Sequence, residues 1–277
     1  MVGYGEIVRA LKEGAARRPE LADTINLYCA LLEIQERVQG PPPEHTPTVD
    51  EARVRLEEGR PLLGPDELET DAQALAELCA RIGFAIAEHR RERVKALAQV
   101  HAWLHERHQQ VRSLAVEYLR SGRIPGSDRA EIDRGLLSFI FSSALRPFLR
   151  MQAQALAPLV DDGKWYRAYC PICGSEPDMA ALERGHGGRR LLCSRCDHEW
   201  TFRRLGCPFC GNEEPAQVAY YPSDDELYRL SVCERCRRYL KTIDLRGIAG
   251  ERLLAAERVL TADMDVAADR AGYRGRA

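Results

Sequence analysis

Apolar residues in the first 160 positions recur at the spacing of amphipathic helices. They run from Ile7 to Leu11 and again from Ile25 to Val38, with an interruption near Pro19. Residues three, four or seven apart lie on one side of a helix. The pattern therefore predicts two short helices before residue 40.

The next stretch is divided by its prolines. The segment Gly40–Pro47 cannot continue a helix, because proline lacks the backbone N–H and clashes with the preceding turn, so we expect a linker or an extended arm. From Pro65 to Leu119 there is no further proline and only one glycine, Gly83. Apolar positions at helical spacing predict two long helices here, joined near the charged stretch His89–Arg93.

One more helix is predicted before the pattern changes. Ser121-Gly122 and Pro125-Gly126 mark a break, and Ser127 or Asp128 would cap a helix that continues to about Leu159. The first 160 residues are therefore predicted to form an all-helical domain.

After Asp161-Asp162-Gly163 the helical period disappears, and short alternating stretches follow. Trp200 and Phe202 would share one face of a strand, and residues 239–245 alternate in the same way. Residues 185–188 and 222–226 have the composition of hairpin turns. A final helix is predicted from about Glu251 to Ala271.

Eight of the ten cysteines fall within 67 residues as four Cys-x-x-Cys pairs. The first half holds Cys170, Cys173, Cys193 and Cys196, and the second half holds Cys207, Cys210, Cys233 and Cys236. Within each half, 19 and 22 residues separate the two pairs. Two cysteines three apart on a tight turn present both sulfur atoms to one ion, and a hairpin returns the second pair opposite the first. The repeat predicts two metal ions per chain, each held within one half.

The ligand type limits the chemistry. Four thiolates in a tetrahedron select zinc or iron over hard cations. A β-unit of this size cannot bury enough surface to fold alone, so the metal would supply folding energy. A closed four-sulfur site leaves no coordination position for a substrate, which argues against hydrolytic catalysis, whereas electron transfer through iron stays open. Cys29 and Cys79 stand alone in helical sequence and are expected to be small buried apolar residues.

Charge and hydropathy narrow the class of protein. The net charge of −2 argues against a protein built mainly to hold nucleic acid or an anionic membrane. Residues 165–246 contain 13 Lys and Arg against 12 Asp and Glu, a difference of +1. A phosphate-binding face made by the arginines of this cysteine-rich region is therefore a minor alternative. The first residues lack the features of a secretory signal, and the most apolar stretch, 136–149, is broken by Arg146 and Pro147. We expect a cytoplasmic protein without membrane insertion.

A second candidate metal site is weaker. His101, His105 and His108 are spaced to share a helix face, but no acidic ligand is fixed beside them. A solvated or partly buried helix face is the preferred interpretation.

The cysteine-rich region, in which each half would form a metal-binding ribbon, resembles a known family. The segments CPICGSEP at 170–177, CSRCDHEW at 193–200 and CERCRRYLKTID at 233–244, in this order after a long helical region, are similar to the formate dehydrogenase accessory (FdhE) family. The resemblance covers about 80 residues in specific detail, and the end near 268–273 is similar to the family's last helix.

The resemblance implies a non-enzymatic cytoplasmic assembly factor needed for active respiratory formate dehydrogenase. It implies binding to the catalytic subunit, which carries molybdenum and iron–sulfur centres and is exported folded by the twin-arginine route. It also favours iron in rubredoxin-like ribbons, with zinc as the other candidate. The alternatives are a rubredoxin-like electron-transfer protein that acts on a client oxidoreductase and, less favoured, a nucleic-acid-binding zinc-ribbon protein.

The predicted fold class is α+β. We expect an all-helical N-terminal domain at 1–163, rubredoxin-like or zinc-ribbon four-cysteine modules at 164–205 and 206–246, and a C-terminal helix and tail at 247–277.

Overall fold

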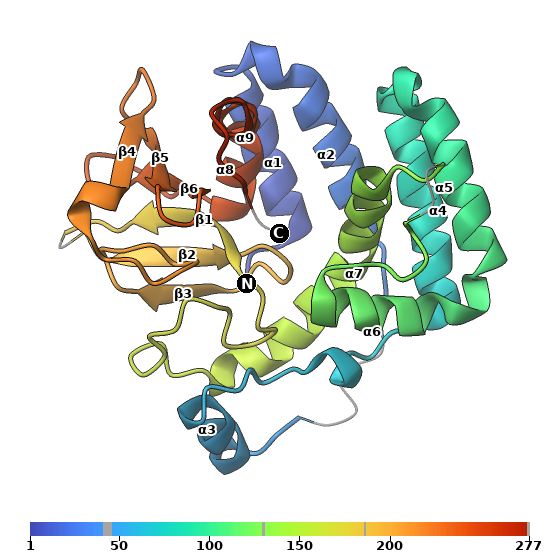
Figure 1. Cartoon of the computed structure of the whole chain (residues 1–277), viewed down its shortest axis with the longest axis horizontal. Coiled ribbons are helices and arrows are strands. Elements are labelled where there is room, and N and C mark those ends of the chain that lie inside the picture. Colours follow the sequence, from blue (N-terminus) through green and yellow to red (C-terminus); the bar gives the residue numbers. More distant parts are fainter. Residues whose placement is uncertain (41–45, 129–130, 186, 276–277) are drawn as a thin grey trace.

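Helices fill the first 160 residues of the computed structural model, as the sequence pattern predicts (Figure 1). The structure describes residues 1–40, 46–128, 131–185 and 187–275. Part of the predicted linker, 41–45, and residue 186 of a predicted turn lie outside these ranges. The helices are α1 (Tyr4–Ala15), α2 (Ala22–Glu36), α3 (Val49–Glu57), α4 (Ala72–His89), α5 (Val94–Glu106), α6 (Val111–Ser121) and α7 (Arg134–Leu156).

The region predicted as two long helices contains three. The first break, a 3-10 turn at Arg91–Arg93, lies where the sequence places it. A second 3-10 turn at His108–Gln110 separates α5 from α6 and folds α6 back against α4. No proline or glycine marks this second break, so the local sequence gave no sign of it.

Helix α7 begins later than predicted and passes through a proline. Its cap is Asp133, whose carboxylate accepts a hydrogen bond from the backbone N–H of Leu136 at 3.0 Å, rather than Ser127 or Asp128. Pro147 leaves the carbonyl of Ser143 without its helical donor. The side-chain amide of Gln35 in α2 donates to that carbonyl at 2.7 Å, so the proline is compensated by a neighbouring helix.

The cysteine-rich region forms one continuous sheet. Its strands are β1 (Pro177–Leu182), β2 (Arg189–Cys193), β3 (Glu199–Phe202), β4 (Val218–Pro222), β5 (Tyr228–Cys233) and β6 (Arg238–Asp244), in the order β3-β2-β1-β6-β5-β4. Each ribbon is an antiparallel three-stranded unit. The two units join through the parallel pair β1 and β6, in which Ala180 is opposite Thr242.

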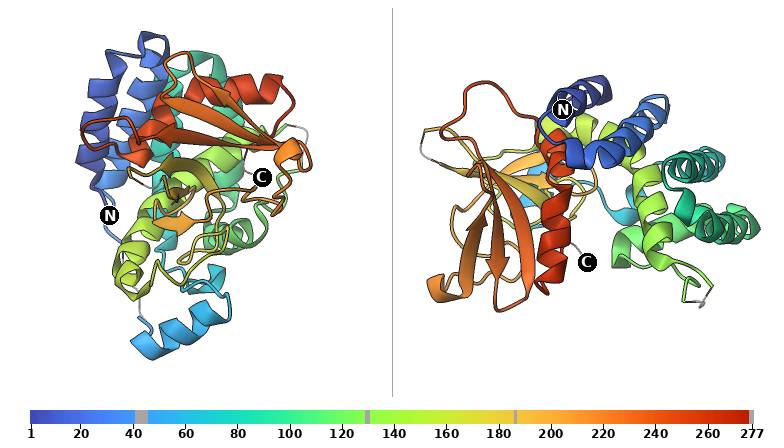
Figure 2. Two further views of the ribbon diagram at one scale, coloured as in Figure 1. Left: turned by 90° about the vertical axis from the view of Figure 1, so that its left-hand side faces the viewer. Right: turned by 90° about the horizontal axis from the view of Figure 1, so that it is seen from above.

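The two faces of the sheet belong to different cores. One face points toward the helices, and its Ala180, Leu191 and Trp200 share a core cluster with residues of α4, α6 and α7. The opposite face contributes Met179, Leu192 and further side chains of β5 and β6 to a core that is covered by the C-terminal helices (Figure 2). Alternation along the strands therefore assigns each side chain to one of two cores.

The C-terminal helix is broken in two. Helix α8 (Leu254–Leu260) and helix α9 (Ala262–Arg270) meet at Thr261. The side chain of Lys241, buried in β6, reaches the break and donates to the backbone carbonyls of Arg258 at 2.8 Å and Thr261 at 3.4 Å. Its ammonium also pairs with Asp265 at 2.6 Å. Carbonyls freed by the break thus find a charged donor.

Among the helices that the structure describes, none has both the length and the apolar character that crossing a membrane requires.

A buried carboxylate connects the sheet to the helices. Asp197 follows the last cysteine of the first ribbon, and its carboxylate pairs with Arg146 and Arg150 of α7 and with Arg258 of α8. Burial by itself would raise the pKa of Asp197, but the positive charges of the three arginines outweigh it and lower the pKa to about 2. Arg146 and Arg258 also donate to the carbonyls of Ser194 and Cys193, at 2.8 and 2.7 Å.

Replacing this carboxylate should destabilise the protein strongly. Asp197→Asn would leave Arg146 and Arg150 without their anion and Arg258 with Asp178 as its remaining carboxylate, and we expect the free energy of unfolding to fall by about 3 kcal/mol or more. The matched control is Asp66→Asn, because Asp66 pairs with Arg120 at 2.8 Å while both side chains are more than half exposed. It should cost less than about 1 kcal/mol. Urea unfolding of the two variants measures the difference, and equal shifts would contradict the role assigned to Asp197.

Candidate metal centres

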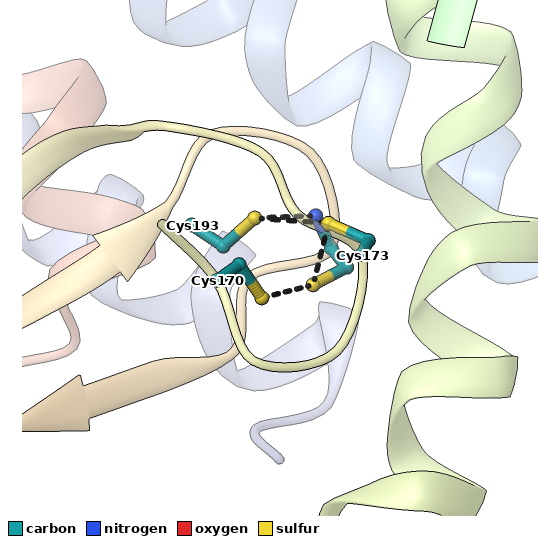
Figure 3. Close-up of side chains that lie close together, drawn as sticks. Cys170, Cys173 and Cys193 are labelled. Carbon is teal, nitrogen blue, oxygen red and sulfur yellow. Dashed lines mark hydrogen bonds between the residues drawn. The ribbon is translucent and has the colours of Figure 1, made fainter. Parts of the chain in front are cut away.

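The first ribbon brings its four cysteines together. Cys170 and Cys173 lie on the turn before β1, Cys193 ends β2, and Cys196 lies on the turn that follows. The sulfur atom of Cys173 is 3.4 Å from that of Cys193 and 3.5 Å from that of Cys196, and the sulfur of Cys170 is 3.6 Å from that of Cys196. Figure 3 shows the labelled side chains converging between the two turns.

The second ribbon repeats the arrangement. Its sulfur atoms approach to 3.7 Å between Cys207 and Cys236, and to 3.7 Å between Cys210 and Cys233. The four sulfur atoms of each ribbon all lie within 4.8 Å of one another. The structure thus groups the eight cysteines as the spacing predicts, with each half self-contained.

The same backbone conformation recurs after every second cysteine. Gly174 and Gly211 have φ of +70°, Asp197 has +56° and Arg237 has +54°. A positive φ turns the chain so that both sulfur atoms of a pair face inward, and glycine adopts it without steric cost. In the second pair of each ribbon a non-glycine residue takes this conformation, which is the less favourable choice.

The spacing of the sulfur atoms fits a tetrahedral metal ion. A metal–sulfur distance of about 2.3 Å in a regular tetrahedron places neighbouring sulfur atoms about 3.8 Å apart. The observed separations of 3.4 to 3.7 Å are close to that value. Four sulfur donors at this separation suit zinc or iron, and the geometry does not distinguish them.

Backbone and side-chain donors surround particular sulfur atoms. The N–H groups of Arg195 and Cys196 donate to the sulfur of Cys193, at 3.4 and 3.5 Å. In the second ribbon, the N–H of Phe209 donates to Cys207 at 3.4 Å, and the side-chain amide of Asn212 approaches the sulfur of Cys233 at 3.8 Å. Such donors favour the thiolate form that a metal requires.

Two thiols show this preference in their pKa values. Burial raises the pKa of Cys193, but hydrogen bonds from the neighbouring thiols and from the N–H of Cys196 lower it overall, well below its usual value. Burial likewise raises the pKa of Cys233, while the backbone N–H of Cys236, the thiol of Cys210 and the amide of Asn212 lower it to about 7. In each ribbon, the donors around one sulfur atom therefore favour its thiolate form.

The remaining cysteines and histidines are not gathered into such groups. Cys29 and Cys79 lie apart, buried in α2 and α4, and burial raises the pKa of Cys79 to about 12. Within the described ranges, the groups of three or more potential metal ligands are the two cysteine sets. His105 and His108 stack with ring centroids 6.1 Å apart, and His101 lies beside Phe84.

Arginines of the ribbons largely face carboxylates. Arg190 pairs with Glu183 at 2.9 Å, Arg238 pairs with Glu176 at 2.6 Å, and Arg203 pairs with Glu213. Arg189 is buried and lies over the ring of Phe202. This pairing reduces the positive charge available to a phosphate backbone.

Sequence reasoning missed the contacts that hold the first set of cysteines in place. Arg146, Arg150 and Arg258 are distant in sequence from Cys196 and meet only at Asp197. The sequence does carry one indication of these contacts. Two arginines four residues apart lie in the apolar helix α7, and buried arginines require an acidic partner.

Comparison with known proteins finds the FdhE family. Residues 169–204 match the family model described as "FdhE, central domain". The chain is 27% identical to a protein FdhE homolog of Aquifex aeolicus strain VF5, over 92% of this chain and 87% of that protein. It is also 27% identical to a protein FdhE homolog of Stutzerimonas stutzeri strain A1501, over 93% of this chain and 82% of that one.

A solved structure has the same fold. The crystal structure of the FdhE protein from Pseudomonas aeruginosa superposes with a TM-score of 0.65 over 98% of this chain and 92% of that chain, at 21% identity. The helical region, the sheet and the C-terminal helices therefore recur together.

Removing ligands from one set should remove one ion only. The double variant Cys170→Ser, Cys173→Ser leaves two thiolates, which cannot complete a tetrahedron. We expect elemental analysis to find two ions per chain in the unaltered protein and one in this variant. The double variant Cys29→Ala, Cys79→Ala is the control and should keep two. Loss of both ions from the first variant would show that the sets do not bind independently.

Proposed function

We propose that this chain is a member of the FdhE family and, on that premise, an accessory protein needed for the production of active formate dehydrogenase. It acts in the cytoplasm as a non-enzymatic factor that binds the catalytic subunit before export. The main support is the combination of similarity over nearly the whole chain with two converging four-cysteine sets.

The eight cysteines of the two sets are proposed as the ligands of two metal ions. Four sulfur atoms close each coordination sphere, so an ion there has no position for a substrate. A bound ion would supply folding energy, of about 10–16 kcal/mol for structural zinc, and iron would add one-electron redox chemistry. The resemblance of the ribbons to the FdhE family favours iron.

In the first ribbon, the folding energy supplied by a bound ion would stabilise neighbouring helices as well as the ribbon. Cys170, Cys193 and Cys196 belong to the same core cluster as the side chains of α4, α6 and α7. A metal at this site would therefore hold the helical surface and the sheet in one arrangement. We infer that the helical domain at 1–163, the ribbons at 164–205 and 206–246, and the C-terminal segment at 247–277 present a joint surface to the client.

One observation supports a second candidate function. Cys210 of the second ribbon is exposed. A metal centre near the surface is placed for electron transfer to a partner, so a rubredoxin-like role toward a client oxidoreductase is the alternative. The visible absorption of anaerobically purified protein separates the two: an iron–thiolate spectrum that bleaches reversibly on reduction favours electron transfer, and a colourless zinc protein excludes it.

The accessory role is tested in cells of the source organism that make formate dehydrogenase. Deleting the gene should abolish most formate-dependent dye reduction while the catalytic subunit is still synthesised, because a maturation step is missing. The tagged full chain should restore activity and co-purify with the catalytic subunit, identified by mass spectrometry.

The variants link the metal sites to this role. Cys170→Ser, Cys173→Ser should lower both activity and co-purification, and the variant Cys29→Ala, Cys79→Ala should support both. Full formate dehydrogenase activity in the deletion strain, together with no co-purification, would overturn the proposal.

A further inference from the structure

The two cysteine sets have the same local geometry but different surroundings. In the first set, none of the twelve residues at 170–175 and 193–198 is exposed. In the matching positions of the second set, 207–212 and 233–238, five are exposed: Cys210, Gly211, Glu234, Arg235 and Arg237. Because the two sets of turns correspond position by position, this difference reflects how the rest of the chain packs around each set.

Contacts from distant segments hold the first set. The backbone N–H groups of Leu62 and Leu63 donate to the carbonyls of Pro171 and Ile172, at 2.9 and 2.8 Å. On the other turn, Arg258 of α8 donates to the carbonyl of Cys193 at 2.7 Å, and Arg195 donates to the carbonyl of Leu119 in α6 at 2.7 Å. Moving any of these cysteines therefore disturbs the main core.

The first turn of the second set is held mainly by its own residues. Within the turn, Cys207 N–H donates to the carbonyl of Asn212, and Gly211 N–H donates to the carbonyl of Cys207. From nearby in the chain, Gln217 accepts from the Asn212 amide, and Arg203 donates to the Gly211 carbonyl at 3.4 Å. Its inward anchor is Phe209, which packs against the core and under Arg238 at 3.8 Å. Cys210 follows that anchor in the sequence and is exposed, as is Gly211 after it.

We propose that the two sites have different tasks: the first retains its ion as part of the core, and the second exchanges its ion readily with external thiolate ligands, opening at Cys210. An incoming thiolate forms one bond to the ion as the bond to Cys210 breaks, and Cys210 leaves as a thiolate that takes a proton from water. No electron is transferred. Repeating the step at the other cysteines delivers the ion to the acceptor.

The physical basis is the extent of unfolding that each release requires. An ion can leave the second site when one exposed turn moves, which is a local opening of low free energy. Release from the first site requires separation of the turns from α6, α7 and α8, an opening closer to global unfolding. The inference concerns the two sites themselves and does not depend on the role in formate dehydrogenase production.

The rates of zinc release test the proposal. The full chain is loaded with two zinc ions and mixed with excess 4-(2-pyridylazo)resorcinol, whose colour change reports released zinc. We expect one ion per chain in a fast phase and the second at least about ten-fold more slowly, because of the larger opening. Cys210→Ser should accelerate the fast phase, because one ligand of that ion is lost, and leave the slow phase unchanged.

The matched control is Cys173→Ser, which alters the corresponding position of the first site. It should change the slow phase and leave the fast phase intact. Alkylation of the unaltered protein with iodoacetamide during the fast phase, followed by mass spectrometry, assigns the ion without relying on variants. Modification should begin at Cys210 and spare Cys170, Cys193 and Cys196. A single release phase, or first modification at the cysteines of the first site, would overturn the proposal.

Discussion

The buried carboxylate of Asp197 connects the metal-binding turn of the first ribbon to helices α7 and α8. The first ribbon lacks a core of its own, whereas α7 and α8 carry guanidinium groups that could not be buried without an anion. Asp197 satisfies both needs because it follows Cys196 directly. The metal-binding turn therefore fixes the carboxylate, and the carboxylate fixes the helices. Removing this carboxylate would be costly because it would leave buried positive charge uncompensated, whereas the exposed ion pairs elsewhere in the chain contribute little.

The parallel pairing of β1 with β6 has a second large consequence. It merges two ribbons of similar sequence into one sheet, with the helical core on one face and α8 and α9 on the other. The first ribbon lies next to the helices, and the second extends outward to the edge strand β4 (Figure 1). Equivalent cysteines thereby acquire unequal environments, although the repeat that encodes them is nearly symmetric.

These features agree with the proposed accessory function. In that proposal the metal ions stabilise a surface for the client, because a closed four-sulfur site offers no position for a substrate. The unequal packing adds a possibility that a purely structural pair of ribbons lacks. In the proposed division of tasks, one site stabilises the scaffold while the other exchanges its ion with external thiolates, so stability and exchange do not compete for the same ion.

Sequence by itself determined the helical first part, the change of period after residue 163 and the grouping of the eight cysteines, because each depends on spacing within a short segment. It also gave the resemblance to the FdhE family, which the comparisons confirm. It could not give the break at Thr261, which Lys241 stabilises from another element, or the cap of α7 at Asp133. The joining of the ribbons, the ion cluster at Asp197 and the exposure of Cys210 were decided only by the tertiary structure. Each of these depends on which distant segments meet, and local periodicity carries no information about that.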